Sequence, residues 1–212
     1  MAADHYRAAL DGSYPFLSEV ADRRRRARQH IQAVSAAADL APNHPAVVDL
    51  LNEALATELI CVSRYRNHSM LSGGRLLASV RGDFLKYASE EQGHADQLAE
   101  RILQLGGTPE LHTPVGNGAP AVGPDEELEA ETLVDLLEED LIAESIAIDS
   151  YREMVQCLSS ADACTRELLE AILAVELTHA QELATMRSEM LRRYRQAGST
   201  STTLPRLELQ CA

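Results

Sequence analysis

Two short motifs combine a carboxylate and an imidazole at the same spacing. Glu91 and His94 form one Glu-x-x-His sequence, and Glu176 and His179 form the other. Residues three apart on a helix project from the same face, so each motif presents one oxygen and one nitrogen ligand together. A single motif of this kind is usually a solvated helix surface, so the spacing alone does not establish a site.

Two further glutamates precede these motifs at matched distances. Glu58 lies 33 residues before Glu91, and Glu144 lies 32 residues before Glu176. Both stand in segments with helical apolar spacing, where a buried carboxylate is costly unless it is paired or bound to a metal. Four helices that carry Glu, Glu-x-x-His, Glu and Glu-x-x-His have the ligand pattern of dinuclear carboxylate bundles.

The two halves of the chain match beyond these six positions. An offset of 86 residues aligns the segment around Glu58 with the segment around Glu144, and it brings Tyr65 onto Tyr151. An offset of 85 aligns the two Glu-x-x-His segments. Each tyrosine lies two turns beyond its glutamate on the same inner face. There the phenol would hydrogen-bond a ligand carboxylate, pass an electron or pack as an ordinary core tyrosine.

We therefore predict an all-α fold in which a duplicated helix pair forms a four-helix bundle. The expected helices span about 46–71, 75–105, 125 or 132 to 158, and 162–193, with Asp162 as the N-cap of the last. A glycine- and proline-rich stretch at 106–124 is long enough to be a crossover between helices two and three. The predicted domains are an N-terminal helical extension (1–45), the bundle (46–195) and a flexible tail (196–212).

Composition limits the function classes. The formal net charge is −14 and the pI about 4.9, so the surface as a whole repels nucleic acid and attracts cations. The arginine run Arg23–Arg26 with Arg28 is interpreted as a solvated helix face, with a DNA-binding arm as the alternative. The four cysteines form no C-x-x-C motif and indicate reduced thiols in a cytoplasmic protein. The sequence contains no apolar run of about 18 residues, so we expect no membrane-spanning helix.

The six predicted ligands carry a formal charge of −4 with neutral imidazoles, which two divalent cations would neutralise. Hard oxygen donors with imidazole suit iron, and manganese or zinc fit the same donors. We predict one dinuclear metal site from Glu58, Glu91, His94, Glu144, Glu176 and His179. Cys61, three residues beyond Glu58, is expected near the inner face as a small buried side chain, with a redox role as the alternative.

Several segments resemble known ferritin-like di-iron carboxylate proteins. Residues 51–59 (LNEALATEL), the Glu-x-x-His runs and residues 101–109 (RILQLGGTP) resemble bacterioferritin. The lengthened middle connection, residues 140–144 (DLIAE) and residues 148–154 (IDSYREM) look like the bacterioferritin-related Dps-like proteins. The resemblance covers about residues 46–190.

This resemblance implies ferroxidase activity, in which dioxygen or hydrogen peroxide oxidises Fe(II) at two iron ions per subunit. It implies a homo-oligomeric shell of 12 or 24 subunits that stores the ferric mineral. The resemblance also implies the role of each ligand in this chain. Glu58 and Glu144 would be terminal ligands, Glu91 and Glu176 would be bridging ligands, and His94 and His179 would be the nitrogen ligands.

The chain also departs from that family. Bacterioferritin places a haem-ligating methionine directly after the helix-two glutamate, where this chain has Gln92, so we expect no stoichiometric haem. Two other function classes stay open. One is a rubrerythrin-like peroxidase, which would need an outside electron donor because a C-x-x-C iron module is missing. The other is a DNA-coating shell that uses the arginine run.

Overall fold

The computed structural model describes five α-helices and the residues next to them, namely residues 15–36, 45–71, 78–111, 130–158 and 162–200. The helices are α2 (Pro15–Ala36), α3 (Pro45–Leu71), α4 (Ala78–Gln104), α5 (Ala130–Cys157) and α6 (Ala163–Thr200). The predicted turn at 72–74, most of the crossover and the last twelve residues lie outside this part of the chain. The all-α prediction is confirmed, and no strand occurs among the described residues.

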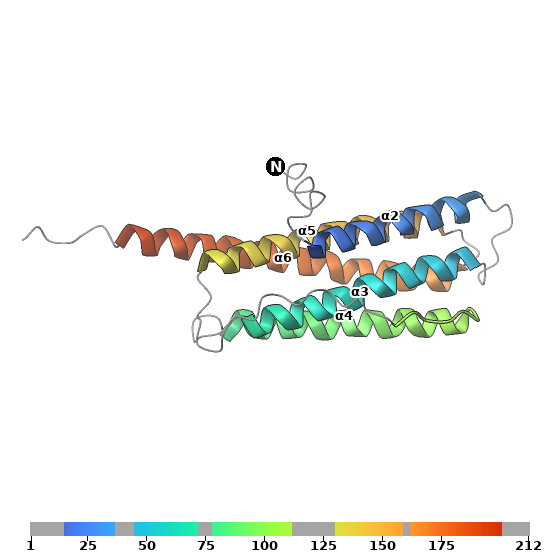
Figure 1. Ribbon diagram of the computed structural model, residues 1–212, viewed down its shortest axis with the longest axis horizontal. Coiled ribbons are helices and arrows are strands. Elements are labelled where there is room, and N and C mark those ends of the chain that lie inside the picture. The colour runs from blue at the N-terminus through green and yellow to red at the C-terminus, as the bar shows by residue number, and fades with distance from the viewer. Residues whose placement is uncertain (1–14, 37–44, 72–77, 112–129, 159–161, 201–212) are drawn as a thin grey trace, which may run out of the picture.

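The last four helices form the bundle. The closest packing is of α3 against α4 and of α5 against α6, as expected for a duplicated helix pair. In Figure 1, α4 and α5 run in the same direction, so the chain between them connects opposite ends of the bundle. The four-helix bundle with a long connection between its second and third helices is therefore as predicted.

Local signals set where the helices begin and end. Pro45 occupies the first turn of α3, where its missing N–H costs nothing. Gly106 closes α4 with a φ of 79°, and the backbone N–H of Gly107 donates to the carbonyl of Ile102 at 2.9 Å. The Asp162 side chain accepts a hydrogen bond from the N–H of Thr165 at 3.1 Å, as expected for the N-cap of α6.

One expectation about the helices was wrong. α6 continues to Thr200 rather than ending near Arg193, and Figure 1 shows its last turns running beyond the other helices.

The arginine run in α2 is not a solvated face. Arg23 and Arg26 donate to Glu53 of α3, at 3.3 and 3.0 Å. Arg24 and Arg28 donate to Glu153 of α5, at 3.1 and 2.8 Å. Two arginines thus bind α2 to α3, and two others bind it to α5.

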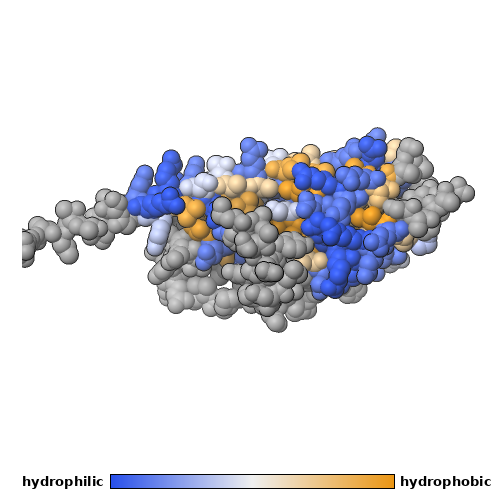
Figure 2. All heavy atoms as spheres, turned by 90° about the horizontal axis from the view of Figure 1, so that it is seen from above, coloured by the Kyte–Doolittle hydropathy of each residue, from blue (hydrophilic) through white to orange (hydrophobic). Residues whose placement is uncertain are grey.

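α2 lies along the groove between α3 and α5, where Figure 1 shows it (blue) beside both. Val20 is buried against Ile60 and Ile146, which lie two residues beyond Glu58 and Glu144. α2 therefore covers the outer side of the two helices that carry the single glutamates. On the described part of this face, hydrophobic and hydrophilic residues are interspersed (Figure 2).

Two large apolar clusters form the core of the bundle. The first packs around Leu50, Leu51, Leu98 and Ile102. The second packs around Phe84, Leu133, Leu137 and Leu183. Each cluster contains one of the two predicted tyrosines, Tyr151 in the first and Tyr65 in the second. The predicted ligands lie between the clusters along the bundle, so apolar layers close the site at both ends.

We expect Glu53→Gln to loosen α2 from the bundle, because it removes the charge that two partly buried guanidinium groups share. Losing a charge-assisted contact costs about 1–3 kcal/mol, measurable as faster amide hydrogen exchange in α2 and a lower thermal midpoint. Arg25→Gln is the control, since Arg25 is 68% exposed and its ion pair among the described residues is with Asp22 of the same helix, at 3.1 Å. Equal exchange in both variants would show that the ion pairs do not hold α2.

Candidate metal centre

The six predicted ligands converge. Glu58, Glu91, Glu144, Glu176, His94 and His179 come from four different helices, and each is at most 5% exposed. They divide into two overlapping groups whose ligand atoms all lie within 4.8 Å of one another. The first group is Glu58, Glu91, His94 and Glu176, and the second is Glu91, Glu144, Glu176 and His179.

Two residues belong to both groups. Glu91 and Glu176 are shared, whereas Glu58 and His94 belong only to the first group and Glu144 and His179 only to the second. The imidazole rings of the two histidines are 6.4 Å apart, centroid to centroid. Two adjacent metal ions would fit this arrangement, with Glu91 and Glu176 available to both and one carboxylate and one imidazole for each.

Several donor atoms of the six ligands do not form hydrogen bonds with one another and are available to bind metal ions. Four buried atoms of this cluster have no hydrogen-bond partner among the described residues: Glu91 Oε1, Glu144 Oε2, Glu176 Oε1 and His179 Nδ1. Glu91 Oε1 lies 3.1 Å from His179 Nδ1, but the pair lacks hydrogen-bonding geometry. Unsatisfied buried oxygens and an imidazole nitrogen that face one another are the donors a divalent cation would take.

Each predicted tyrosine supports the glutamate of the other half. Tyr65 of α3 donates its phenolic hydrogen to Glu144 of α5, and Tyr151 of α5 donates to Glu58 of α3. Both phenols are buried, and burial raises their pKa well above the usual value, so they remain protonated donors. The phenols therefore fix one oxygen of each single glutamate and leave the other for a metal.

The titration of the cluster reflects its crowded carboxylates. Burial raises the pKa of Glu91 and Glu144, and repulsion from Glu176 raises both further. Burial alone would lower the pKa of His94, but the carboxylates of Glu176, Glu58 and Glu91 close to its Nδ1 raise it to about 12. The pKa of His179 is raised to about 9, because the nearby carboxylates of Glu176 and Glu144 outweigh burial. Protons thus neutralise part of the charge that metal ions would neutralise.

The two imidazoles are held differently. Nε2 of His179 lies 2.8 Å from Glu90 Oε2, and the Tyr87 ring packs on the same imidazole at 4.8 Å. This contact turns Nδ1 of His179 towards the carboxylates. Neither Glu90 nor Tyr87 was identified from the sequence, because neither belongs to the repeated pattern of the two halves.

A second buried cluster adjoins the site on one side only. Asp140 is fully buried one turn before Glu144, accepts a hydrogen bond from Arg64 and lies 2.9 Å from His68 Nδ1. Although burial opposes it, attraction to His68 and Arg64 lowers the pKa of Asp140. The sequence gave no signal for this cluster, since its members are 72 and 76 residues apart.

Cys61 is a buried free thiol in the cluster around Tyr65. Burial raises the pKa of its thiol well above the usual value, and the site glutamates raise it further. It therefore stays a neutral side chain, which agrees with the packing interpretation. Gln92, at the position that bears the haem ligand in bacterioferritin, donates to Asp96 of the same helix at 2.9 Å.

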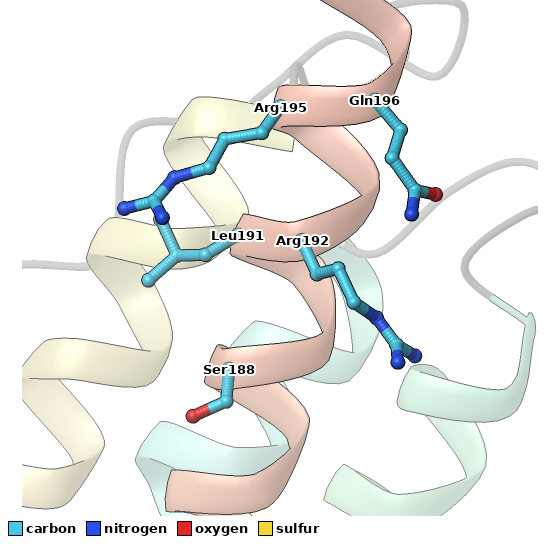
Figure 3. Close-up of a pocket in the computed structure, with 5 residues that line it drawn as sticks. All are labelled: Ser188, Leu191, Arg192, Arg195 and Gln196. Carbon is cyan, nitrogen blue, oxygen red and sulfur yellow. The ribbon is translucent and has the colours of Figure 1, made fainter.

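A cavity of about 440 Å³ lies away from these residues. Figure 3 shows its lining on the last turns of α6, with Arg192 and Arg195 as its charged members, and Ser188, Leu191 and Gln196 beside them. It contains no metal-ligating carboxylate or imidazole among the described residues. Among the described helices, none is both long and apolar enough to cross a membrane.

Known proteins share this fold and this residue pattern. A family model described as a ferritin-like domain matches residues 48–192. The bacterioferritin of Rhodobacter capsulatus is 33% identical over 142 residues, which cover 66% of this chain and 81% of that protein. A bacterioferritin of Mycobacterium tuberculosis is 29% identical over 142 residues, which cover 66% of this chain and 83% of that protein.

Solved structures agree. The R. capsulatus bacterioferritin, described with a metal-free dinuclear site and a haem iron, has 29% identity and a TM-score of 0.60 over 80% of this chain and 98% of that one. A dodecameric thioferritin of Bacteroides fragilis has 22% identity and a TM-score of 0.58 over 86% of this chain and 99% of that one, a likeness that shows the fold alone.

Fold and site together define a ferritin-like protein. The chain belongs to the ferritin-like family, among the bacterioferritins. The predicted resemblance to bacterioferritin is therefore confirmed, whereas the resemblance to Dps-like proteins gains no support from these relatives. α2 lies outside the matched residues and is an addition to the shared bundle.

Metal binding to this cluster should release protons. At pH 7 the metal-free protein holds protons on His94 and His179, whose pKa values are raised to about 12 and about 9. Ligation requires the neutral imidazoles, so binding should weaken as the pH falls. Titration calorimetry with Zn²⁺ in buffers of different ionisation enthalpy would count the protons.

In the same measurement, His94→Gln should release fewer protons than the unchanged protein. His30→Gln is the control, because His30 lies on α2 beside Asp49 and away from the cluster. An unchanged proton count in His94→Gln would show that His94 is not a ligand.

Proposed function

We propose that this protein is a ferroxidase that oxidises Fe(II) with dioxygen or hydrogen peroxide and stores the ferric product. The observation that carries the proposal is the pair of overlapping ligand groups, which share Glu91 and Glu176. Bacterioferritin relatives and the ferritin-like fold support the same assignment. Fe(II) is both the substrate and the ion for which these donors are suited.

In this proposal each ligand has a separate role. Glu58 and Glu144 are terminal carboxylates, Glu91 and Glu176 bridge the two positions, and the two histidines supply the nitrogen ligands. Two iron ions bound together supply two electrons to one oxidant. Manganese and zinc would occupy the same donors without this chemistry at physiological potentials.

The surrounding side chains prepare the site. Tyr65 and Tyr151 hold Glu144 and Glu58 in place through their phenolic hydrogens. The apolar clusters at either end keep water from competing for the carboxylates, which strengthens their attraction for cations. Repulsion among the carboxylates favours cation uptake, because each bound cation relieves it.

Storage requires an enclosed space, since the site itself has donors for only two ions per chain. We therefore propose a homo-oligomeric shell of 12 or 24 subunits. The competing DNA-coating function has little support, because four arginines of the α2 run are bound to Glu53 and Glu153. A peroxidase remains the competitor that shares the site.

Glu91→Ala should abolish rapid Fe(II) oxidation, because it removes one bridging carboxylate. We expect a loss of at least about 100-fold, more than is usual for residues that only support a ligand. The bundle should still fold, since removing one buried carboxylate relieves repulsion in the metal-free protein. Stopped-flow absorbance after aerobic Fe(II) addition, with circular dichroism of the metal-free protein, measures both.

Glu100→Ala is the matched control, because Glu100 is an exposed glutamate of the same helix. Ferroxidase activity would be refuted if Glu91→Ala and Glu100→Ala oxidised Fe(II) at the same rate. Fast turnover of hydrogen peroxide without accumulation of ferric mineral in the unchanged protein would identify the peroxidase instead.

The purified protein should have the mass of a large closed assembly. Each chain contributes 23.2 kDa, so native mass spectrometry or light scattering distinguishes a shell from a monomer or dimer. A protein that stays monomeric at micromolar concentration would rule out storage and leave oxidation at the dinuclear site as its function.

A further inference from the structure

The bundle has two thinly packed sides, and α2 covers one of them. Direct packing between the two helix pairs is sparse both where α3 meets α5 and where α4 meets α6. α2 packs on both α3 and α5, and Figure 1 shows it running beside them. Among the described helices, none packs on both α4 and α6 in this way. Within the described part of the chain, the α3–α5 side and the α4–α6 side are therefore covered unequally.

The cover on the α3–α5 side lies close to the metal centre. Val20 of α2 is 1% exposed and packs against Ile60 of α3 and Ile146 of α5. These isoleucines lie two residues beyond Glu58 and Glu144, a rise of about 3 Å along each helix. Side chains two positions apart point to roughly opposite sides of a helix, so the glutamates face inwards where the isoleucines face α2. Val20 is therefore outside the centre, at nearly its height along the bundle.

One apolar stripe and two sets of ion pairs hold α2 in this position. Val20, Ala27 and Ile31 are seven and four residues apart, the spacing of one helix face. Ala27 and Ile31 pack with the first of the two apolar clusters. The arginines on one side of this stripe donate to Glu53 of α3, and those on the other side donate to Glu153 of α5. These contacts on both helices fix α2 across the space between them.

On the α4–α6 side, a proposed ligand remains in contact with a partly exposed group. Nε2 of His179 lies 2.8 Å from Glu90, whose side chain is 38% exposed. Tyr87, which packs on the same imidazole, is also among the residues that line a surface hollow of about 550 Å³. Asp83 and Glu182 line this hollow as well. Acidic side chains therefore lead from solvent towards the centre on this side, whereas apolar side chains separate it from solvent on the other.

We propose that α2 closes the α3–α5 side of the dinuclear centre, so that metal ions enter and leave it on the α4–α6 side. The inference rests on the dinuclear centre of the proposed function, but it does not depend on the oxidation of Fe(II). The arginines of α2 donate to Glu53 and Glu153, neither of which is a proposed ligand. α2 thus governs how fast ions reach the ligands and leaves the ligands themselves unchanged.

A cover has a kinetic signature that a merely stabilising helix lacks. Because α2 docks through residues other than the ligands, the free energy of docking is the same with and without bound metal. Loosening α2 then raises the rates of metal binding and metal release by the same factor and leaves the dissociation constant unchanged. A helix that only held the ligands in place would change the dissociation constant when it is loosened.

Co²⁺ is the probe for this test, since its visible absorption reports binding without an oxidation step. The full-length metal-free protein would be mixed with Co²⁺ in a stopped-flow instrument, and the loaded protein would be mixed with an excess of chelator. In the double variant Glu53→Gln with Glu153→Gln, both rates should rise several-fold at an unchanged dissociation constant. The loss of two negative charges would by itself slow the approach of a cation, so faster binding reports an opened side.

Glu100→Gln with Glu170→Gln is the matched control, because both glutamates are exposed and the same charge is removed away from α2. Its rates should not exceed those of the unchanged protein. Val20→Asn is a second test at constant charge. It places an amide against Ile60 and Ile146, which disfavours docking of α2 and should also raise both rates.

Rates of Val20→Asn and of the Glu53/Glu153 variant that equal those of the control would overturn the proposed role of α2 and leave the dinuclear centre intact. Faster rates with a changed dissociation constant would also overturn it, because α2 would then support the ligands. If the unchanged protein binds no Co²⁺ at the six ligands, the dinuclear centre is wrong, and the proposed function and this inference are wrong with it.

Discussion

Mutual repulsion among four buried carboxylates is the constraint on which the rest of this structure depends. Glu58, Glu91, Glu144 and Glu176 are each 1% exposed, in a bundle with apolar clusters on both sides. Charges in such surroundings are costly unless they are compensated. In the metal-free protein the compensation comes from two protonated imidazoles and from the raised pKa of Glu91 and Glu144, and it leaves four donor atoms unsatisfied. The bundle thus keeps its ligands in a high-energy arrangement that cations relieve.

The duplicated halves depend on each other at this point. Tyr65 supports the glutamate of α5 and Tyr151 supports the glutamate of α3, so neither helix pair completes its own site. Glu91 and Glu176 likewise belong to both ligand groups. The direct packing between the two pairs is sparse compared with the packing inside each pair. Polar contacts around the site, and α2 bridging α3 and α5 from outside, therefore hold the pairs together.

The parts of this structure that repeat along the chain were predictable from the sequence, and the parts formed by unrepeated long-range pairs were not. Helix periodicity and the matched spacing of Glu58 and Glu144 suffice to place six side chains in one cluster, and in the structure the six lie together. The arginine run was misread because its partner Glu153 lies 129 residues from Arg24, and a count of charges says nothing about which ones meet. Asp140 shows the same limit, since a lone acidic residue in α5 has no visible partner until the helices pack.

The departures from the repeat give the two ligand groups unequal surroundings. With the offset of 86, Arg64, His68 and Asp140 correspond to Ser150, Met154 and Ala54, so a buried charged cluster on one side matches an uncharged set on the other. That cluster lies one turn from Glu144, and Tyr87 and Glu90 contact the histidine of the same position. Ligands of identical type in unequal fields bind ions with unequal affinity and potential. A duplicated ligand set thus gives two ligand groups with different surroundings, one beside Tyr87, Glu90 and the buried Asp140 cluster and the other without these neighbours.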